Sequence, residues 1–201
     1  LVRASLRGSN GGKGGILLRM VAAGAEVRKG REILKKAASK LTRRGIAVPD
    51  PIPPLGVMIE VPGAALAADA LAQDSDFFAI GSNDLTMYTL AIDRGNEHVA
   101  HLFDPLHPGL LRLLQFSAGA ALRARIPISI CGEMAGDPRY TALLLGLGIR
   151  ELSMTPSNIP LVKQRVREMD MAAANHRAGV IMDQVDAGRI AMLLEIGRAT
   201  V

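Results

Sequence analysis

The sequence predicts an α/β fold of the (β/α)8, TIM-type barrel class, with about five parallel strands that correspond to strands 4–8 of such a barrel. Apolar runs alternate with helical segments along the 201 residues, as they do in parallel sheets. Hydrophobic residues make up 49% of the chain and aromatic residues only 3%, so the core is aliphatic and suits a sheet buried on both faces. Three apolar runs also end in a side chain that can carry chemistry, which is typical of a barrel rim.

The individual strands and helices follow from hydrophobic periodicity and from the Gly and Pro residues that separate the segments. Strands are expected at 16–21, 56–61, 76–81, 126–131 and 151–154. Helices are expected at 25–45, 63–73, 85–92, 109–124, 138–147, 158–170 and 173–198. An open doubly wound sheet is the alternative to a barrel, although its G-x-G-x-x-G fingerprint after the first strand is absent.

The net charge of +5 is concentrated in the segment 26–44, which also contains Leu34, Ala37, Ala38 and Leu41. The helical spacing of these four apolar residues predicts an outer helix with one buried face and a solvated basic face. No aromatic residues alternate with the basic ones, so we do not expect a nucleic-acid partner. No apolar run is long enough to cross a bilayer, so we do not expect a membrane partner either.

Polar side chains follow two neighbouring strands of the predicted sheet. Glu60 ends one apolar run, and Asn83 and Asp84 follow the next. Each carboxylate taken singly could cap a helix or form an ion pair, but together at a barrel rim they predict a site for Mg²⁺, with Mn²⁺ as the alternative ion. Asn83 can donate to an anionic oxygen. Arg94, on the following loop, can bind a phosphate or a carboxylate through two hydrogen bonds.

Cys131 is the only cysteine and ends the predicted strand 126–131. A single cysteine excludes an internal disulfide and indicates a reducing, cytoplasmic location. A thiol with an ordinary pKa of about 8.5 is mostly protonated at neutral pH, so Cys131 could act as a proton donor. The residue taken alone fits a small buried apolar side chain better, and both interpretations stay open at this point.

Several longer motifs resemble one family. They are GVMIEVPGAA at 56–65, DFFAIGSNDLTMYTLAIDRGN at 76–96, DPLHP at 104–108, CGEMAGDP at 131–138 and LGLGIRELSM at 145–154. Together they closely resemble Enzyme I of the bacterial phosphoenolpyruvate–sugar phosphotransferase system, including its nitrogen-related form. Pyruvate phosphate dikinase and phosphoenolpyruvate synthase are similar around the carboxylate and Asn-Asp motifs only.

The resemblance implies a phosphoenolpyruvate-binding barrel with a defined set of roles. Glu60 and Asp84 match the family's Mg²⁺ ligands. Asn83, Asp84 and Arg94 match residues that bind phosphoenolpyruvate. Cys131 matches the proton donor that converts the enolate to pyruvate. The resemblance therefore favours the catalytic interpretation of the thiol over the purely structural one.

The resemblance also implies parts that lie outside residues 1–201. In the family, a histidine on a separate amino-terminal domain accepts the phosphoryl group and passes it to a histidine-containing phosphocarrier protein. Two phosphate-binding arginines lie on earlier barrel strands. We therefore expect residues 1–201 to be the carboxyl-terminal part of the barrel domain, inactive alone, and to form a homodimer as family members do.

Two other functions stay open. One is a non-catalytic dimerisation fragment of the same enzyme. The other is a metal-dependent pyruvate aldolase or lyase on the same type of barrel, against which the Cys131 motif and the Arg94 loop argue. The sequence does not distinguish the sugar branch of the phosphotransferase system from the nitrogen-regulatory branch.

Overall fold

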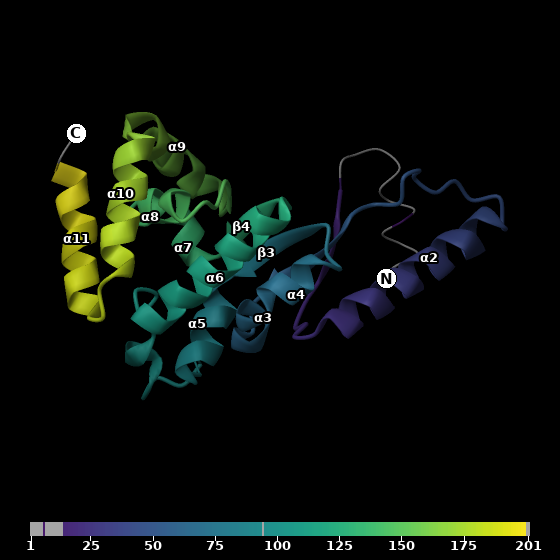
Figure 1. The fold of residues 1–201 in the computed structure, drawn as a ribbon, viewed down its shortest axis with the longest axis horizontal. Helices are drawn as coiled ribbons and strands as arrows, with labels where there is room; N and C mark the ends of the chain where they lie inside the picture. Colours follow the sequence, from purple (N-terminus) through teal and green to yellow (C-terminus); the bar gives the residue numbers. More distant parts are fainter. Residues whose placement is uncertain (1–5, 7–13, 94, 200–201) are drawn as a thin grey trace.

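The structure is a computed structural model that describes residue 6, residues 14–93 and residues 95–199 (Figure 1). The described residues contain a five-stranded sheet in which every neighbouring pair of strands is parallel. The strands are β1 (Ile16–Leu18), β2 (Leu55–Ile59), β3 (Phe77–Gly81), β4 (Ile128–Cys131) and β5 (Glu151–Ser153). All five overlap the segments that the hydrophobic pattern predicts.

The strands lie in the sheet in their order along the chain, β1-β2-β3-β4-β5. Each crossover therefore moves one strand further in the same direction, whereas a doubly wound sheet reverses direction at a switch point. Because parallel crossovers are right-handed, a constant direction places the connecting helices on the same side, as in a barrel. The partial TIM-type barrel is thus confirmed, and within the described residues it is an open arc.

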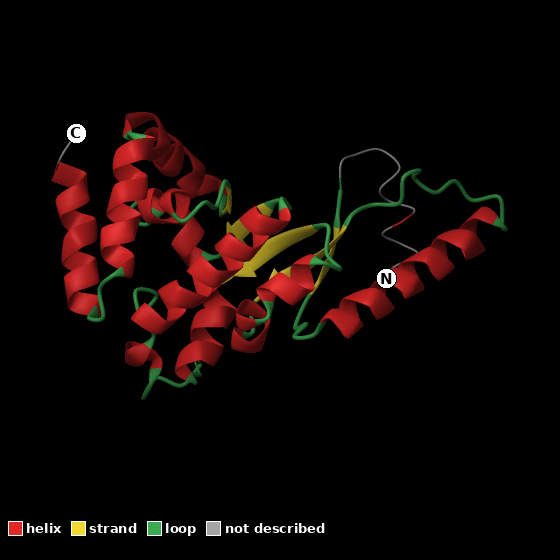
Figure 2. Cartoon of the chain, in the orientation of Figure 1, coloured by secondary structure: helices red, strands yellow, loops and turns green. Residues whose placement is uncertain are grey.

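The helices pack along the sheet and extend the molecule beyond it at both ends (Figures 1 and 2). They are α2 (Gly24–Thr42), α3 (Pro62–Leu66), α4 (Ala68–Ala72), α5 (Ser82–Leu90), α6 (Pro108–Ala124), α7 (Glu133–Gly136), α8 (Thr141–Gly146), α9 (Ile159–Glu168), α10 (Met171–Met182) and α11 (Ala187–Ala199), with 3₁₀ turns at Ala100–Leu102 and Pro156–Asn158. Helix α2 lies at one end of the molecule, and α9, α10 and α11 lie at the other. None of the helices in the described ranges combines the length and apolar character needed to span a bilayer.

Two predicted helices are each divided into two shorter ones, and a third begins later than predicted. The segment 173–198 breaks after α10, and Asp186 accepts a hydrogen bond from the Arg189 backbone N–H at 2.8 Å, which caps the start of α11. The segment 138–147 was expected to begin at Pro138. Instead the Asp137 side chain accepts from the Arg139 N–H at 2.9 Å, which forms a turn and delays α8.

The other break divides 63–73 into α3 and α4 at Ala67, whose φ is −95° and ψ 15°. Alanine favours a continuous helix, so local propensity does not explain this break. Both short helices pack against α6, and the bend lets each of them follow that helix. Helix α5 also begins at Ser82 rather than at residue 85, which places Asn83 and Asp84 in its first turn.

The core is aliphatic, as the composition predicts. Ile59, Ile80 and Ile130 are fully buried on adjacent strands, and the register pairs Ile80 with both of the others. Burying such a side chain contributes about 1.5–3 kcal/mol to stability. This row of branched side chains fixes the level at which the three strands end, and therefore the level of the side chains that follow them.

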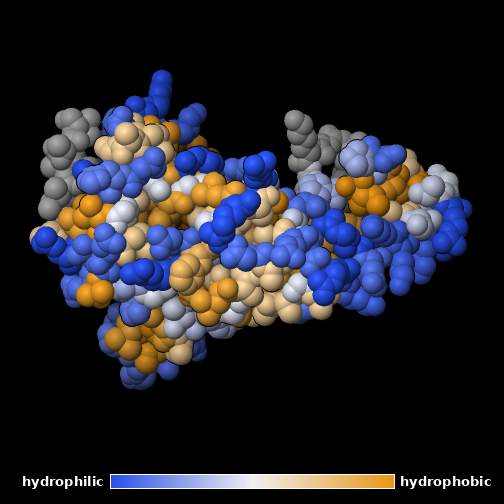
Figure 3. All heavy atoms as spheres, in the orientation of Figure 1, coloured by the Kyte–Doolittle hydropathy of each residue, from blue (hydrophilic) through white to orange (hydrophobic). Residues whose placement is uncertain are grey.

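Helix α2 has the predicted amphipathic character. Val27, Leu34, Ala37, Ala38 and Leu41 are buried, while most of its basic side chains are exposed. Hydrophilic residues accordingly cover the lower edge of the α2 end of the molecule in Figure 3, and hydrophobic residues lie above them. The basic face of α2 is therefore a solvated helix face.

Asp76 links α2 to the sheet. Its carboxylate accepts hydrogen bonds at 3.0 Å from both terminal nitrogens of Arg31 and at 2.6 Å from the Leu55 backbone N–H. Burial raises the pKa of Asp76, but the hydrogen bonds from Arg31 and Leu55 outweigh it, so the pKa lies below its ordinary value. The ionised carboxylate is thus the form that holds the start of β2 and the α2 side chain together.

We expect Asp76→Asn to lower the free energy of unfolding by about 1 kcal/mol at pH 7, a value that allows for the partial exposure of the ion pair. Because the folded-state pKa is lowered, the contribution is present above the ordinary Asp pKa of about 3.9 and is lost as the pH falls through the folded-state value. Urea unfolding of both proteins at pH 7 and pH 3 measures this. A difference that does not shrink at pH 3 would contradict the assignment.

Candidate metal and substrate site at the carboxyl edge of the sheet

Three groups lie at the same level along the carboxyl edge of the sheet. Ile59 pairs with Ile80, and Glu60 is the next residue after Ile59. Gly81, the next residue after Ile80, pairs with Cys131. Because the strands are parallel and in register, Glu60, Gly81 and Cys131 form one row across β2, β3 and β4.

The carboxylates of Glu60 and Asp84 both bind the guanidinium of Arg19. The Nη2 atom of Arg19 lies 3.0 Å from Oε2 of Glu60 and 2.8 Å from Oδ2 of Asp84. The Glu60 side chain is completely buried, whereas 34% of the Asp84 side chain is exposed. The Met20 backbone N–H also donates to Oε1 of Glu60 at 2.8 Å. Glu60 is therefore the fixed, inner carboxylate of the pair, and Asp84 is the outer one.

The two carboxylates have opposite pKa shifts. Burial raises the pKa of Glu60, but hydrogen bonds from Arg19 and the Met20 N–H outweigh it, and the pKa lies below its ordinary value. Burial raises the pKa of Asp84, and the hydrogen bond and negative charge of Glu60 raise it further, against the opposing charge of Arg19. Two carboxylates that both lie within 3.0 Å of one nitrogen favour binding of either a proton or a cation between them.

Gly81 makes room for the Glu60 side chain. A Cβ atom at position 81 would lie 3.1 Å from Cβ of Glu60, 3.2 Å from its Oε2 and 3.2 Å from Sδ of Met58. Glu60 is fully buried, so it cannot move aside into solvent. The absence of a side chain at position 81 thus fixes the direction in which Glu60 points.

Gly81→Ala is therefore expected to shift the Glu60 carboxylate and to weaken divalent-ion binding about tenfold, a loss of about 1.4 kcal/mol. Isothermal titration with Mn²⁺ measures this. Gly179→Ala in α10 is the matched control, because nothing lies within 4 Å of a Cβ at that position. Equal affinity in the Gly81→Ala variant and the native chain would show that Glu60 is positioned in another way.

Cys131 faces the same edge and is partly buried. Its thiol donates to the Ile80 carbonyl, with an S–O distance of 3.4 Å. Burial raises the pKa of the Cys131 thiol, and the negative charge of Glu60 raises it further. The thiol is therefore protonated at neutral pH, which is the form a proton donor needs.

The turn after Cys131 packs closely on the start of α5. Ser82 Oγ donates to the Cys131 carbonyl at 2.7 Å, and the Asn83 side-chain oxygen accepts from the Glu133 N–H at 3.4 Å. Gly132 has φ +106°, and a Cβ there would lie 2.7 Å from Ser82 Oγ. Only glycine combines this backbone conformation with this close approach. The motif around Cys131 thus holds the thiol and Asn83 in a fixed relation.

Asn83 and Cys131 share a cavity of about 430 Å³. Its other lining residues are Gly132, Glu133, Gly136, Ser153, Met154, Thr155 and Asn158. This volume lies in the range typical of small-molecule sites. The cavity is thus bordered by β4, by β5 and by the start of α5.

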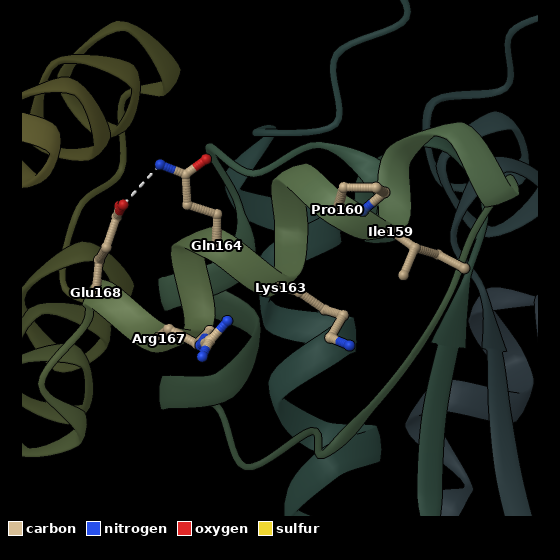
Figure 4. A pocket seen from close by; sticks show the side chains of 6 residues that line it. All are labelled: Ile159, Pro160, Lys163, Gln164, Arg167 and Glu168. Carbon is tan, nitrogen blue, oxygen red and sulfur yellow. Dashed lines mark hydrogen bonds between the residues drawn. The ribbon is translucent and has the colours of Figure 1, made fainter.

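A second cavity is lined by side chains of α9 (Figure 4). Its volume is about 550 Å³, and its lining residues are Ile159, Pro160, Lys163, Gln164, Arg167 and Glu168. Gln164 donates to Glu168 at 2.8 Å along the helix. None of the side chains predicted to carry chemistry lines this cavity, so it is not part of the candidate site.

The donor set fits a divalent ion only together with further oxygens. Within the described residues, no group of three or more His, Cys, Asp and Glu side chains could enclose a metal ion. Glu60 and Asp84 nevertheless place one oxygen each within 3.0 Å of the same cationic nitrogen. Mg²⁺ commonly takes one or two carboxylates and completes its octahedron with substrate oxygens and water. The residues present therefore fit such an ion.

The structure brings together Glu60, Asp84, Asn83 and Cys131, whereas Arg94 lies outside the described residues. Sequence reasoning missed Arg19. The signal was available, because Arg19 follows β1 directly, as Glu60 follows β2. The predicted strand 16–21 places Arg19 inside the strand, whereas β1 ends at Leu18 and leaves Arg19 at the carboxyl edge.

This geometry defines an α/β barrel domain whose chemistry-bearing side chains lie at the carboxyl edge of its strands, the usual place for barrel active sites. Residues 1–171 match the family described as PEP-utilising enzyme, PEP-binding domain, where PEP is phosphoenolpyruvate. The chain belongs to this family of PEP-utilising enzymes.

Named relatives agree with this assignment. The phosphoenolpyruvate-protein phosphotransferase of Cupriavidus necator is 45% identical over 92% of this chain and 30% of that protein. The proteins of the same name from Haemophilus influenzae and Haloferax volcanii are 38% and 39% identical over 96% and 97% of this chain, and over 34% and 35% of their own lengths. The chain therefore spans about a third of the length of these relatives.

A solved structure supports the fold. A citrate lyase from Burkholderia xenovorans superposes with a TM-score of 0.61 over 99% of this chain and 68% of that chain. The two sequences are only 17% identical, so this similarity concerns the fold alone.

Proposed function

We propose that the chain binds phosphoenolpyruvate and provides the pyruvate-forming half of a phosphoenolpyruvate-protein phosphotransferase reaction. The observation that carries the proposal is the convergence of Glu60 and Asp84 on one cation position beside the Asn83–Cys131 cavity. The names of the 38–45% identical relatives support it. The sequence motifs that resemble Enzyme I point the same way.

Each side chain has a defined task in this reaction. Glu60 and Asp84 would hold Mg²⁺, or Mn²⁺ in its place, and Asn83 would donate from its amide to an anionic substrate oxygen. When bound, the ion supplies positive charge that stabilises the phosphate and carboxylate oxygens of the substrate. Arg94 is proposed to bind the same anion, on the strength of the sequence motif alone. Charge stabilisation of this kind is the main requirement for phosphoryl transfer.

Cys131 completes the chemistry. The bond between phosphorus and the enol oxygen breaks, and the phosphoryl group passes to a histidine nitrogen of the enzyme. The Cys131 thiol then gives its proton to the terminal carbon of the remaining enolate, which forms a C–H bond and yields pyruvate. The resulting thiolate regains a proton from water. A protonated thiol beside Glu60 has the protonation state that this step requires.

We also propose the setting of this reaction. Residues 1–201 contribute the carboxyl-terminal part of the barrel, and the acceptor histidine lies on another domain that phosphorylates a histidine-containing carrier protein. The assembly is a homodimer. A free thiol that must stay reduced fits the cytoplasm. These assignments depend on the resemblance to Enzyme I and on the names of the longer relatives.

The binding step is tested by ³¹P NMR of phosphoenolpyruvate titrated with the chain, with Mg²⁺ present or removed by a chelator. We expect line broadening that requires Mg²⁺ and is lost in Asp84→Asn. Asp69→Asn is the matched control, because Asp69 pairs with Arg123 on the helix surface as Asp84 pairs with Arg19 in the site. A folded chain whose addition leaves the spectrum unchanged would contradict the proposal and favour a non-catalytic module.

A further inference from the structure

Arg19 contacts both carboxylates of the site through one guanidinium. Its Nε and Nη2 atoms lie 3.3 Å and 3.0 Å from the two oxygens of Glu60, and Nη2 also lies 2.8 Å from Asp84. Hydrogen bonds between ionised groups are roughly twice as strong as neutral ones. The guanidinium thus uses the same oxygens that a divalent ion would need.

The backbone supports this placement. Met20 adopts φ +56°, a left-handed conformation that is uncommon for residues other than Gly, Asn and Asp. In this conformation its N–H donates to Glu60, so that consecutive residues present a side chain and a backbone N–H to one carboxylate. A backbone of this kind persists only where the surroundings hold it, and here the buried Glu60 does so.

Arg19 and a metal ion cannot occupy the site together. The Nη2 atom lies about 3 Å from each carboxylate oxygen, whereas Mg²⁺ needs oxygens at about 2.1 Å and excludes another cation from the same position. Of the three partners, Arg19 is the most exposed. Its side chain is 62% exposed, while that of Asp84 is 34% exposed and that of Glu60 is completely buried.

We propose that Arg19 is an internal cation that occupies the metal position in the ligand-free chain and must be displaced before a divalent ion binds. This inference rests on the proposed function, because it takes Glu60 and Asp84 to be metal ligands. Arg19 therefore sets the metal affinity of the site: it keeps the buried carboxylate neutralised when no ion is present, and it makes ion binding weaker than two free carboxylates would.

Isothermal titration with Mn²⁺ tests the competition. We expect Arg19→Met to bind Mn²⁺ about tenfold more tightly than the native chain, which corresponds to about 1.4 kcal/mol. Arg123→Met is the matched control, because Arg123 is 64% exposed and also binds a carboxylate through Nε and Nη2, but on Asp69, outside the site. The Arg123→Met variant should bind Mn²⁺ with the same affinity as the native chain.

NMR follows the guanidinium directly and distinguishes occupancy from a general charge effect. We expect Mg²⁺ to shift the Arg19 Nε–H resonance while the Arg123 Nε–H resonance stays in place. Equal Mn²⁺ affinity in the native chain and Arg19→Met would overturn the inference about Arg19, and so would an Arg19 resonance that does not move on saturation. Neither result would contradict the assignment of Glu60 and Asp84 as metal ligands. If neither protein binds Mn²⁺, the metal role of Glu60 and Asp84 fails, and the proposed function fails with it.

Discussion

Replacing Glu60 by Gln is expected to weaken Mn²⁺ binding by at least about a hundredfold. Glu60 is the fully buried member of the carboxylate pair, and its position is fixed by the Arg19 guanidinium and the Met20 N–H. Gln has nearly the same shape but no charge, so the site loses half of its negative charge. A shift of this size corresponds to about 2.7 kcal/mol of binding free energy.

The same substitution should lower the free energy of unfolding by about 1–3 kcal/mol, the usual cost of leaving a buried polar group without its partner. The Gln amide group presents N–H donors where Arg19 and Met20 already donate, so at least one donor loses its acceptor. Isothermal titration and urea unfolding measure the two effects. Asp69→Asn, at the exposed surface pair, should change neither by a comparable amount.

An Mn²⁺ affinity in Glu60→Gln within threefold of the native value would show that the ion, if it binds, uses other ligands. A loss of metal binding in a variant that no longer folds would be ambiguous. Circular dichroism at the titration temperature therefore accompanies the measurement, and Glu60→Asp provides a second variant. Asp keeps the charge but shortens the side chain, so it should retain folding with intermediate affinity.

The sequence predicts the sheet well because its signal is local. Each strand is a short apolar run, so hydrophobic periodicity locates it. The sequential order that distinguishes a barrel from a doubly wound sheet comes from the structure. Helix ends are predicted less well, because they depend on contacts made elsewhere in the fold. Nothing in the alanine-rich stretch around Ala67 announces the break between α3 and α4, where both pieces follow the surface of α6.

The candidate site likewise has parts that a local sequence signal predicts and parts that depend on contacts made elsewhere in the fold. The positions of Glu60, Asp84 and Cys131 follow from the rule that parallel strands end at one edge, and motif resemblance adds their roles. The occupancy of the site by Arg19 does not follow from that rule. It depends on the left-handed turn at Met20, where no Gly signals such a conformation, and on the burial of Glu60. Both arise only when β1 and β2 lie side by side.

Cys131→Ala is expected to lower the rate at which the chain exchanges the methyl protons of pyruvate with deuterium by about 10²–10⁴, the usual contribution of general acid–base catalysis. This exchange is the protonation step run in reverse, with the thiolate as the base, and it needs no acceptor histidine. Because burial and the charge of Glu60 raise the pKa of the thiol, the thiolate fraction increases only at high pH. The native rate should therefore rise with pH until it passes a pKa above the ordinary value of about 8.5.

Proton NMR in D₂O, with Mg²⁺ and pyruvate, measures the exchange. The Cys131→Ala variant should bind Mn²⁺ as the native chain does, because among the described residues the thiol donates to the Ile80 carbonyl and to neither carboxylate. Unchanged metal affinity with lost exchange separates a role in proton transfer from a role in building the site. If Ala at position 131 supports exchange at the native rate with the same pH profile, the proton comes from another group, and the thiol is a small buried side chain as the residue alone suggests.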